Sequence, residues 1–268
     1  MPEIPFVKAH GAGNDFLLTW RQDADSLDDL PTAARAICAR HTGIGADGWL
    51  LVDPHAGAAD ASIVLYNSDG SIPELSGNGT RCAAAWLIHS GVAPKPDLHI
   101  ATGAGVKTLR LIHREGNHFE FEMNMGTPQL ASGGLHAHLA LGARSVEAVL
   151  VNVGNPQCVI LCDEFPADWR ELGAALEHHP HFPLRTNVSF VRVLDEHTID
   201  VLFWERGAGE TQSSGTGSTG AAAAAILRGL AQSPVTVQTP AGPLNFRWNG
   251  EASLTGPAEI TARGVFFL

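Results

Sequence analysis

Short apolar runs rich in β-branched and aromatic residues alternate along the chain with a few helical segments. Runs of this length and composition, bounded by Gly, Pro, Asn and Asp, predict β-strands. The expected strands are residues 16–20, 48–52, 61–66 and 107–112 in the first half, and 148–153, 158–161, 187–193 and 198–204 in the second. Apolar residues at helical spacing predict helices at residues 32–40 and 169–177.

A break in this pattern lies near the middle of the chain. Residues 119–126 alternate polar and apolar side chains, and the alternation ends at Gly126, Thr127 and Pro128, which are residues typical of a turn. The 268 residues leave room for two domains of roughly 130 residues each. We therefore expect a domain boundary near this break.

One pattern occurs twice. Residues 76–85 read SGNGTRCAAA and residues 214–223 read SGTGSTGAAA, each typical of a glycine-rich turn that leads into an alanine-rich helix. The N–H groups at such a helix start, together with the helix dipole, form an anion site. Two such sites, each with a serine at its mouth (Ser76 and Ser214), suit a reaction that must reach both faces of one carbon.

Composition and charge narrow the class of protein. Hydrophobic residues make up 44% and charged residues 17%, as in an ordinary globular protein, and the net charge of −11 argues against a nucleic-acid or anionic-membrane partner. No apolar run reaches the roughly 18 residues that span a bilayer, and the first residues show no signal-peptide pattern. The scattered cysteines fit neither a disulfide nor a zinc pattern; they are Cys38, Cys82, Cys158 and Cys162. We expect a cytoplasmic protein.

These motifs also have competing interpretations. Residues 215–220 fit the dinucleotide pattern G-x-G-x-x-G, but a polar segment precedes them and no acidic residue follows about 20 positions later. Neither serine lies in the G-x-S-x-G elbow of a serine hydrolase. The run of His178, His179 and His181 has no standard metal spacing and predicts an exposed loop. Two turns that merely start helices would be unremarkable singly, but this leaves the duplication unexplained.

Further polar clusters are expected where strands end, at residues 8–16, 43–48, 67–71, 154–157, 186–188 and 205–210. Each cluster alone is typical of a turn, because Asn and Asp favour turns. Among their side chains are four asparagine amides, the guanidinium of Arg206 and the carboxylate of Glu205. This set suits a small zwitterion with both carboxylate and ammonium groups.

The ordered segments KAHGAGNDF, GIGADG, NSDGS with SGNGTRCA, GNPQ, TNVSF, and ERGAGET with SGTGSTGAAA resemble the diaminopimelate epimerases, within the cofactor-independent amino-acid racemases and epimerases. The resemblance runs nearly end to end. It implies an α/β (α+β) fold of two pseudo-symmetric domains, each a rolled mixed sheet around a central helix, with the active site in the cleft between them. The implied domains are residues 1–122 with 258–268, and residues 123–257.

The resemblance also implies the activity and the site. The family interconverts LL- and meso-diaminopimelate by two-base α-proton transfer, for lysine and peptidoglycan precursors, with neither pyridoxal phosphate nor metal, and a homodimer is possible. The implied acid/base positions are Ser76 and Ser214, with Glu205 beside the reacting centre. The implied contacts to the amino acid are Asn14, Asn67, Asn155, Asn187, Glu205 and Arg206, of which Asn67, Asn187 and Arg206 suit its distal end. Backbone N–H groups of Gly77, Asn78, Gly215 and Thr216 would hold the α-carboxylate.

The chain departs from the family pattern at its most reactive positions. Both acid/base positions are cysteines in the family, and Gln157 stands where the family often has histidine, while Cys82 comes six residues too late to replace Ser76. Ionising a hydroxyl instead of a thiol costs at least on the order of 5 kcal/mol more. Three explanations remain: a natural variant with activated serines, a deliberate replacement that traps a substrate, or a scaffold that binds an amino acid or racemises a different one.

Overall fold

The structure, a computed structural model, describes residues 3–54, 57–131 and 133–268, so Met1 and Pro2 of the expected first domain lie outside the described residues. The chain folds as two compact units. Unit 1 comprises Met1–Met123 with Gly256–Leu268, and unit 2 comprises Asn124–Thr255. Strands dominate both units and are mixed parallel and antiparallel, so the fold class is mixed α/β.

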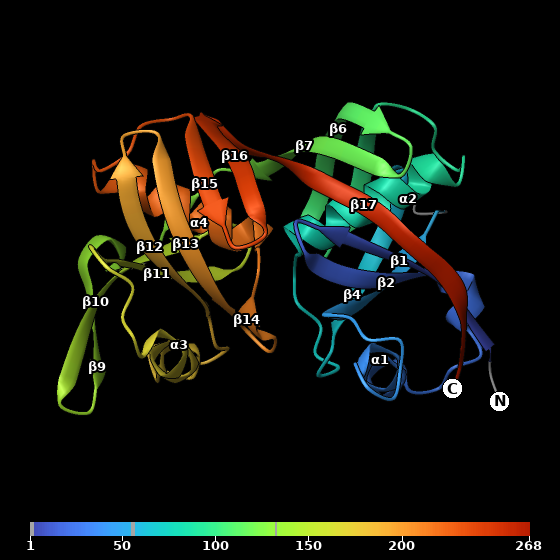
Figure 1. Ribbon diagram of the computed structural model, residues 1–268, viewed down its shortest axis with the longest axis horizontal. Helices are drawn as coiled ribbons and strands as arrows, with labels where there is room; N and C mark the ends of the chain where they lie inside the picture. Colours follow the sequence, from blue (N-terminus) through green and yellow to red (C-terminus); the bar gives the residue numbers. More distant parts are fainter. Residues whose placement is uncertain (1–2, 55–56, 132) are drawn as a thin grey trace. The chain divides into compact units, whose positions relative to one another are not determined.

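Unit 1 is a ring of strands around one helix (Figure 1). Its elements are β1 (Glu3–Gly11), β2 (Asn14–Trp20), η1 (Arg21–Ala24), α1 (Leu30–Cys38), β3 (Gly48–Asp53), β4 (Ala61–Asn67), α2 (Gly77–His89), β5 (Asp97–Thr102), β6 (Gly105–Glu115), most of β7 (His118–Gly126) and the second part of β17 (Glu251–Phe267). Strand β17 pairs with both β1 and β7, which closes the ring.

Helix α2 is the centre of unit 1. Every residue from Gly77 to Ile88 is buried, and the helix packs against β1 to β5. Alanines at positions 83, 84 and 85 have small side chains, so the surrounding strands can approach the helix closely. Helix α1 packs on β3 and β4 instead, where Ile37 and Trp49 join a second apolar cluster.

Unit 2 has a mixed sheet with a buried helix of its own (Figure 1). Its elements are β8 (Gln129–Leu130), η2 (Gly134–His136), β9 (Ala137–Leu141), β10 (Arg144–Asn152), β11 (Pro156–Leu161), α3 (Trp169–Glu177), β12 (Asn187–Asp195), β13 (Thr198–Glu205), β14 (Gly209–Thr211), α4 (Gly215–Leu227), β15 (Val235–Thr239), β16 (Gly242–Asn249) and the first part of β17. Helix α4 is buried from Gly215 to Ala225 and packs against β10 to β13, β15 and β16.

The two units repeat one order of elements. In unit 1, β1 and β2 are antiparallel, α1 leads to β3 parallel to β2, β4 returns antiparallel, and α2 leads to β5 parallel to β4. In unit 2, β10, β11, α3, β12, β13, α4 and β15 repeat these steps with the same strand directions. The duplicated motif therefore starts the equivalent helix in each unit, α2 and α4.

Most of the expected elements are confirmed, with two corrections. The helix expected at 32–40 runs instead from Leu30 to Cys38, because Asp29 caps its start by accepting from the N–H of Thr32 at 3.0 Å. The glycines of the duplicated motif do not form a separate turn. Helix α2 begins at Gly77 and α4 at Gly215, directly after the serines, so these glycines form the first helical turn.

The sequence pattern did not predict several of the strands. They are β1, β5, β8, β9 and β14 to β17. Strand β17 contains Gly256 and Pro257, residues that normally mark a turn, and its continuity depends on pairing with β1 and β7, which are far away in the sequence.

The histidine run follows α3 as expected. His178 is exposed and its ring contacts the carbonyl of Ala174 at 3.1 Å, while the ring of His179 contacts the carbonyl of Ala140 at 3.0 Å. Within the described residues, no group of three or more His, Cys, Asp or Glu side chains is arranged to hold a metal ion. Across the same residues, no helix combines the length and apolar character needed to cross a membrane.

Candidate active site

The start of α2 is built around Ser76. Its Oγ accepts from the N–H of Gly79 at 3.0 Å, and its carbonyl accepts the first helical bond, from Thr80, at 2.9 Å. A serine in this role is a typical N-cap. The geometry of an α-helix supplies no acceptor within the helix for the N–H groups of Gly77 and Asn78. The helix dipole also makes this end favourable for negative charge.

The start of α4 repeats this arrangement around Ser214. Its Oγ accepts from the N–H of Gly217 at 3.0 Å, and its carbonyl accepts from Ser218 at 2.9 Å. Ser214 is 2% exposed, whereas Ser76 is half-buried. As in α2, the N–H groups of Gly215 and Thr216 have no acceptor within the helix. Each unit thus has one helix start whose N–H groups and dipole favour an anion, with a hydroxyl at its edge.

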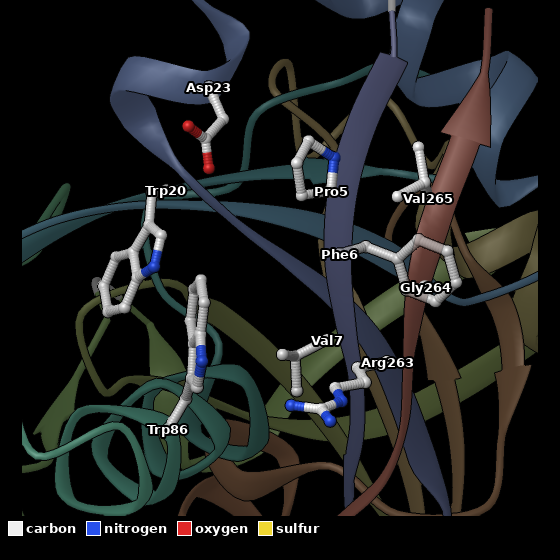
Figure 2. Close-up of a pocket in the computed structure, with 9 residues that line it drawn as sticks. All are labelled: Pro5, Phe6, Val7, Trp20, Asp23, Trp86, Arg263, Gly264 and Val265. Carbon is white, nitrogen blue, oxygen red and sulfur yellow. The ribbon is translucent and has the colours of Figure 1, made fainter.

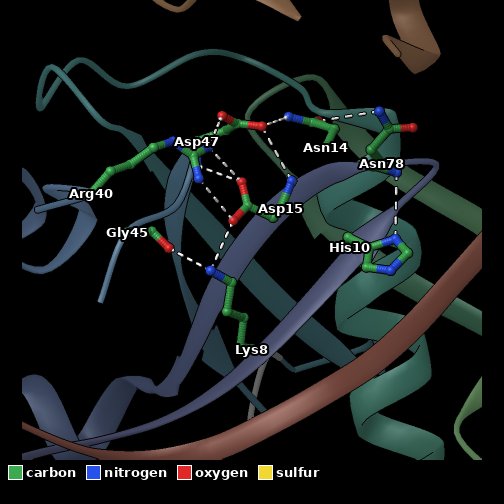
Figure 3. Close-up of polar contacts among 9 residues, drawn as sticks. Lys8, His10, Asn14, Asp15, Arg40, Gly45, Asp47 and Asn78 are labelled. Carbon is green, nitrogen blue, oxygen red and sulfur yellow. Dashed lines mark hydrogen bonds and ion pairs between the residues drawn. The ribbon is translucent and has the colours of Figure 1, made fainter. Parts of the chain in front are cut away.

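Two predicted asparagines lie together in unit 1 (Figure 3). Asn14 Nδ2 donates to Asp47 Oδ2 at 2.6 Å, and Asn14 Oδ1 accepts from Asn78 Nδ2 at 3.1 Å. Asn78 Oδ1 in turn accepts from Arg81 Nη2. The residues on β2 and α2 that form this line of hydrogen bonds are all buried. Asn14 is 4% exposed, Asn78 is 1% exposed and Arg81 is 0% exposed.

A cluster of ion pairs surrounds Asp47, the residue at the acceptor end of this line of hydrogen bonds (Figure 3). Arg40 contacts Asp15 at 2.8 Å and Asp47 at 2.7 Å, and Lys8 contacts Asp15 at 3.0 Å. Burial, followed by repulsion from Asp15, raises the pKa of Asp47. Although burial opposes it, hydrogen bonds from Arg40 and Lys8 hold the pKa of Asp15 below its usual value. The surroundings of the two carboxyls thus lower the pKa of Asp15 and raise the pKa of Asp47.

The third predicted asparagine of unit 1 lies elsewhere. Asn67 is half-buried at the end of β4, and its Nδ2 donates to Ser71 Oγ at 2.9 Å within the same loop. This bond holds the Asn67 side chain within its own loop, at the end of β4.

In unit 2, Asn155 lies beside the start of α4. Its Nδ2 donates to Thr216 Oγ1 at 3.2 Å, and its Oδ1 accepts from Gln157 Nε2 at 2.7 Å. Gln157 is 2% exposed and packs so closely on Gly220 that a Cβ there would meet its Cγ at 2.9 Å. Gln157 therefore orients the side chain of Asn155.

Asn187 and Arg206 also lie together. Asn187 Oδ1 accepts from the N–H of Arg206 at 3.0 Å, and its Nδ2 donates to the carbonyl of Pro156 at 3.1 Å. The Arg206 guanidinium donates to the carbonyl of Leu184 at 3.1 Å. Glu205 immediately precedes Arg206 at the end of β13 and is half-buried.

A buried glutamate that the sequence analysis missed holds this turn. Glu177 is 4% exposed and accepts from the N–H of Gly207 at 3.0 Å, from Trp204 Nε1 at 2.9 Å and from Arg185 at 3.1 Å. A buried carboxylate needs such donors to compensate for lost hydration. Glu177 thereby ties the end of α3 to the turn that carries Glu205 and Arg206.

Three of the four cysteines are poor candidates for a base. Cys82 is fully buried, and burial raises its pKa to about 12. Burial likewise raises the pKa values of Cys38 and Cys158 to about 12. Because a thiol reacts as its thiolate, these groups are chemically quiet near neutral pH.

The described residues of unit 1 line at least two cavities. One, of about 100 Å³, adjoins Ser76 and is lined mainly by apolar groups, among them Leu50, Ile72 and Leu75. The other, of about 510 Å³, is a groove beside β1 and β17 in which the rings of Trp20 and Trp86 stack at 3.7 Å (Figure 2). Trp86 follows Ser76 by ten residues of α2, roughly 15 Å along the helix, so the large groove is not at the serine end.

Comparison with known proteins identifies the family. The family model described as diaminopimelate epimerase matches residues 6–131 and 149–261. The diaminopimelate epimerase of Moorella thermoacetica is 38% identical over 275 residues, which cover 97% of this chain and 98% of the relative. That of Desulfitobacterium hafniense is 36% identical over 277 residues, with 98% of each chain covered. The chain belongs to the diaminopimelate epimerase family.

Solved structures show the same fold outside the immediate family. A hydroxyproline epimerase from Agrobacterium vitis, with bound trans-4-hydroxy-L-proline, superposes with a TM-score of 0.76 at 17% identity, covering 98% of this chain and 92% of the other. A phenazine biosynthesis protein of the PhzF family from Bacillus anthracis gives a TM-score of 0.71 at 16% identity over the full length of both chains. This diaminopimelate epimerase family member therefore shares its fold with other epimerases and with the PhzF group.

Proposed function

We propose that the protein is a diaminopimelate epimerase, interconverting LL- and meso-diaminopimelate, with Ser76 and Ser214 in the acid/base positions. One observation carries the proposal: an N-capping serine begins the equivalent buried helix in each of the two units. Membership of the diaminopimelate epimerase family supports diaminopimelate as the substrate. The polar groups around the two helix starts supply the carboxylate and ammonium partners that a diamino dicarboxylate needs.

In this mechanism, one serine, ionised to its alkoxide, removes the α-proton from one face of the carbon. The other serine delivers its hydroxyl proton to the opposite face, so one proton is taken up and one is released from the protein in each turnover. The two serines exchange roles in the reverse reaction. Negative charge builds on the α-carboxylate as the proton leaves, and the N–H groups at the two helix starts stabilise it.

The remaining contacts divide between the two ends of the substrate. Asn14, Asn78 and Asn155 lie next to the helix starts and suit the reacting end. Asn67, Asn187 and Arg206 suit the distal end, where the planar guanidinium can bind a carboxylate with two parallel hydrogen bonds. Glu205 accompanies the reacting centre as a partner of the ammonium group or of a serine.

We propose further that the two units are pseudo-symmetric domains whose serines face each other across a cleft. The repeated order of elements supports this arrangement. Both hydroxyls must approach one carbon closely for two-base transfer. A liganded crystal structure with the two hydroxyl oxygens more than about 10 Å apart would exclude it.

Solvent deuterium exchange tests the reaction itself. Incubation of LL-diaminopimelate with the protein in D₂O should replace the α-hydrogen, and the exchange should be lost in a Ser76→Ala, Ser214→Ala variant. The competing function is binding of an amino acid without catalysis. It is favoured by the fact that both serine Oγ atoms already serve as helix caps. Tight binding of diaminopimelate without any exchange would establish that alternative.

We also propose a cytoplasmic homodimer. The free cysteines suit a reducing compartment. The groove of Figure 2 carries opposite charges on Asp23 and Arg263, and β17 exposes Val265 and Phe267 by 43% and 63%. Opposite charges on one patch are self-complementary across a two-fold axis. Sedimentation of a Phe267→Glu variant should show a monomer, and a persistent dimer would place the interface elsewhere.

A further inference from the structure

A single line of hydrogen bonds runs from a surface ion cluster to a buried arginine in unit 1. Asp47 accepts from Asn14, Asn14 accepts from Asn78, and Asn78 accepts from Arg81. Figure 3 shows the first two of these bonds, which join β2 to the first turn of α2. The line thus connects residues that are far apart in the sequence and contains two of the asparagines expected at the substrate.

Each end of this line can play only one part in a hydrogen bond. An ionised carboxylate can only accept hydrogen bonds, and a guanidinium can only donate them. Asn14 must therefore turn its NH₂ group toward Asp47, which leaves its oxygen to accept from Asn78. Asn78 must turn its oxygen toward Arg81, which leaves its NH₂ group for Asn14. An asparagine without such neighbours can flip, because its two ends have nearly the same shape.

Both ends are also fixed in place. Arg81 is fully buried, and its Nε donates to the carbonyl of Pro257 at 3.2 Å. Asp47 Oδ2 accepts from the backbone N–H of Asp15 at 3.2 Å, while Asp47 Oδ1 accepts from Arg40 at 2.7 Å. The three groups that contact the Asp47 carboxylate through these bonds, from Asn14, Asp15 and Arg40, are all donors, as its acceptor role requires.

We propose that Asp47 and Arg81 are positioning residues that fix the donor and acceptor directions of Asn14 and Asn78 for amino-acid binding. This inference rests on the proposed function, because it gives a role to two asparagines placed at the substrate. A flipped amide presents N–H where the ligand needs oxygen, or the reverse. One such mismatch lowers affinity by about tenfold to a hundredfold.

Substitutions at Asp47 separate this role from a simple charge effect. Asp47→Ala removes the acceptor of Asn14 Nδ2, so only the bond from Asn78 still orients Asn14, and we expect affinity for diaminopimelate to fall about tenfold. Asp47→Asn removes the charge but keeps an oxygen that can accept from Asn14, so it should recover most of the loss. A role limited to the ion pair with Arg40 predicts that both substitutions are equally harmful.

Asp15→Asn is the matched control. Asp15 pairs with the same Arg40 and also with Lys8, but its carboxylate does not accept from Asn14. We expect this substitution to disturb the ion cluster and to leave affinity within about threefold of the parent. A large loss of affinity in Asp15→Asn would overturn the inference, since the charge cluster itself would then be responsible.

Calorimetric titration with LL-diaminopimelate measures these affinities even where turnover is slow, and circular dichroism melts confirm that each variant is folded. Arg81→Lys keeps a donor-only group and supplies an independent test at the other end, with affinity expected to fall less than in Arg81→Met. If Asp47→Ala does not fold, this lysine–methionine comparison decides: equal losses would overturn the inference.

Asn14→Ala distinguishes failure of the inference from failure of the proposed function. Loss of affinity in Asn14→Ala with none in Asp47→Ala would refute the positioning role and leave the site assignment intact. Unchanged affinity in Asn14→Ala would refute both, because Asn14 would then lie away from the ligand. The inference is supported if affinity falls in Asn14→Ala and in Asp47→Ala, and falls no further when the two substitutions are combined.

Discussion

Replacing Ser76 and Ser214 together with cysteine should convert this chain into a faster epimerase. The change introduces one heavier atom at each helix start and leaves every other proposed contact in place. It acts on the acidity of the group that removes the α-proton, which is the step that the serines make difficult. Efficient proton transfer requires a group whose pKa is near the working pH.

The magnitude follows from the environment of the two side chains. Forming an alkoxide costs at least on the order of 5 kcal/mol more than forming a thiolate. Each serine caps a helix start, where the dipole stabilises an anion by at most about 2 kcal/mol. This contribution is too small to offset the difference, and it favours a thiolate equally. We therefore expect turnover to rise by about a thousandfold or more.

The same substitutions should weaken the fold. Ser76 Oγ and Ser214 Oγ each accept a backbone N–H at 3.0 Å, and losing a serine cap costs about 1 kcal/mol. The loss should be larger at Ser214, which is 2% exposed, than at the half-buried Ser76. A sulfur atom at position 214 has little room, because Gly217 already lies against Phe203.

Epimerisation of pure LL-diaminopimelate, followed by chiral chromatography, measures the gain, and thermal melts measure the loss of stability. Each single cysteine variant should gain less than the double variant, because each product requires a competent group on its own face. A fast serine enzyme that is slowed by cysteine would refute the reasoning and indicate a different base. A double variant that binds substrate without exchanging its α-hydrogen would support the binding-protein alternative.

Three further predictions follow from named side chains. Arg206→Lys should weaken diaminopimelate binding about tenfold, because a planar two-pronged donor is lost although the charge is kept; equal calorimetric affinity would show that Arg206 does not bind the distal carboxylate. Iodoacetamide near neutral pH should leave Cys82, Cys38 and Cys158 unmodified by mass spectrometry, since burial raises the pKa of each to about 12; rapid labelling of the native protein would contradict their burial. Backbone carbonyls of Pro234 and Gln232 raise the pKa of His197, so its stabilising contribution is present below the unfolded pKa of about 6.5 and is lost as pH rises through the folded value. His197→Gln should thus lower the melting temperature more at about pH 5.5 than at about pH 8.5, and an equal effect at both would refute the shift.

Local patterns predicted the elements whose residues carry their own signal. The helix Trp169–Glu177 was placed to the residue, because its apolar positions recur at helical spacing. Strand β17 was missed because Gly256 and Pro257 indicate a turn locally, whereas long-range pairing with β1 and β7 keeps the chain extended. Tertiary contacts overruled the local signal there.

The site divides in the same way. Ser76 and Ser214 stood out because their motif is duplicated, and both begin helices as the pattern indicated. Asp47, Arg81 and Glu177 were not singled out, because their roles depend on partners brought together only by the fold. One signal was present for Arg81: it is a charged residue directly before the apolar run of residues 82–88, where burial demands a partner.

Strand β17 also bears on the order in which the chain is made. Unit 1 needs residues from both ends of the sequence, because β1 pairs with β17 and β17 closes the ring against β7. A ribosome releases β1 first and β17 last, so the edges of β1 and β7 wait unpaired while all of unit 2 is synthesised. Unit 2 can complete most of its pairing in that interval. The first unit to begin is therefore the last to be finished, and its two open edges are the part of the nascent protein most exposed to mispairing.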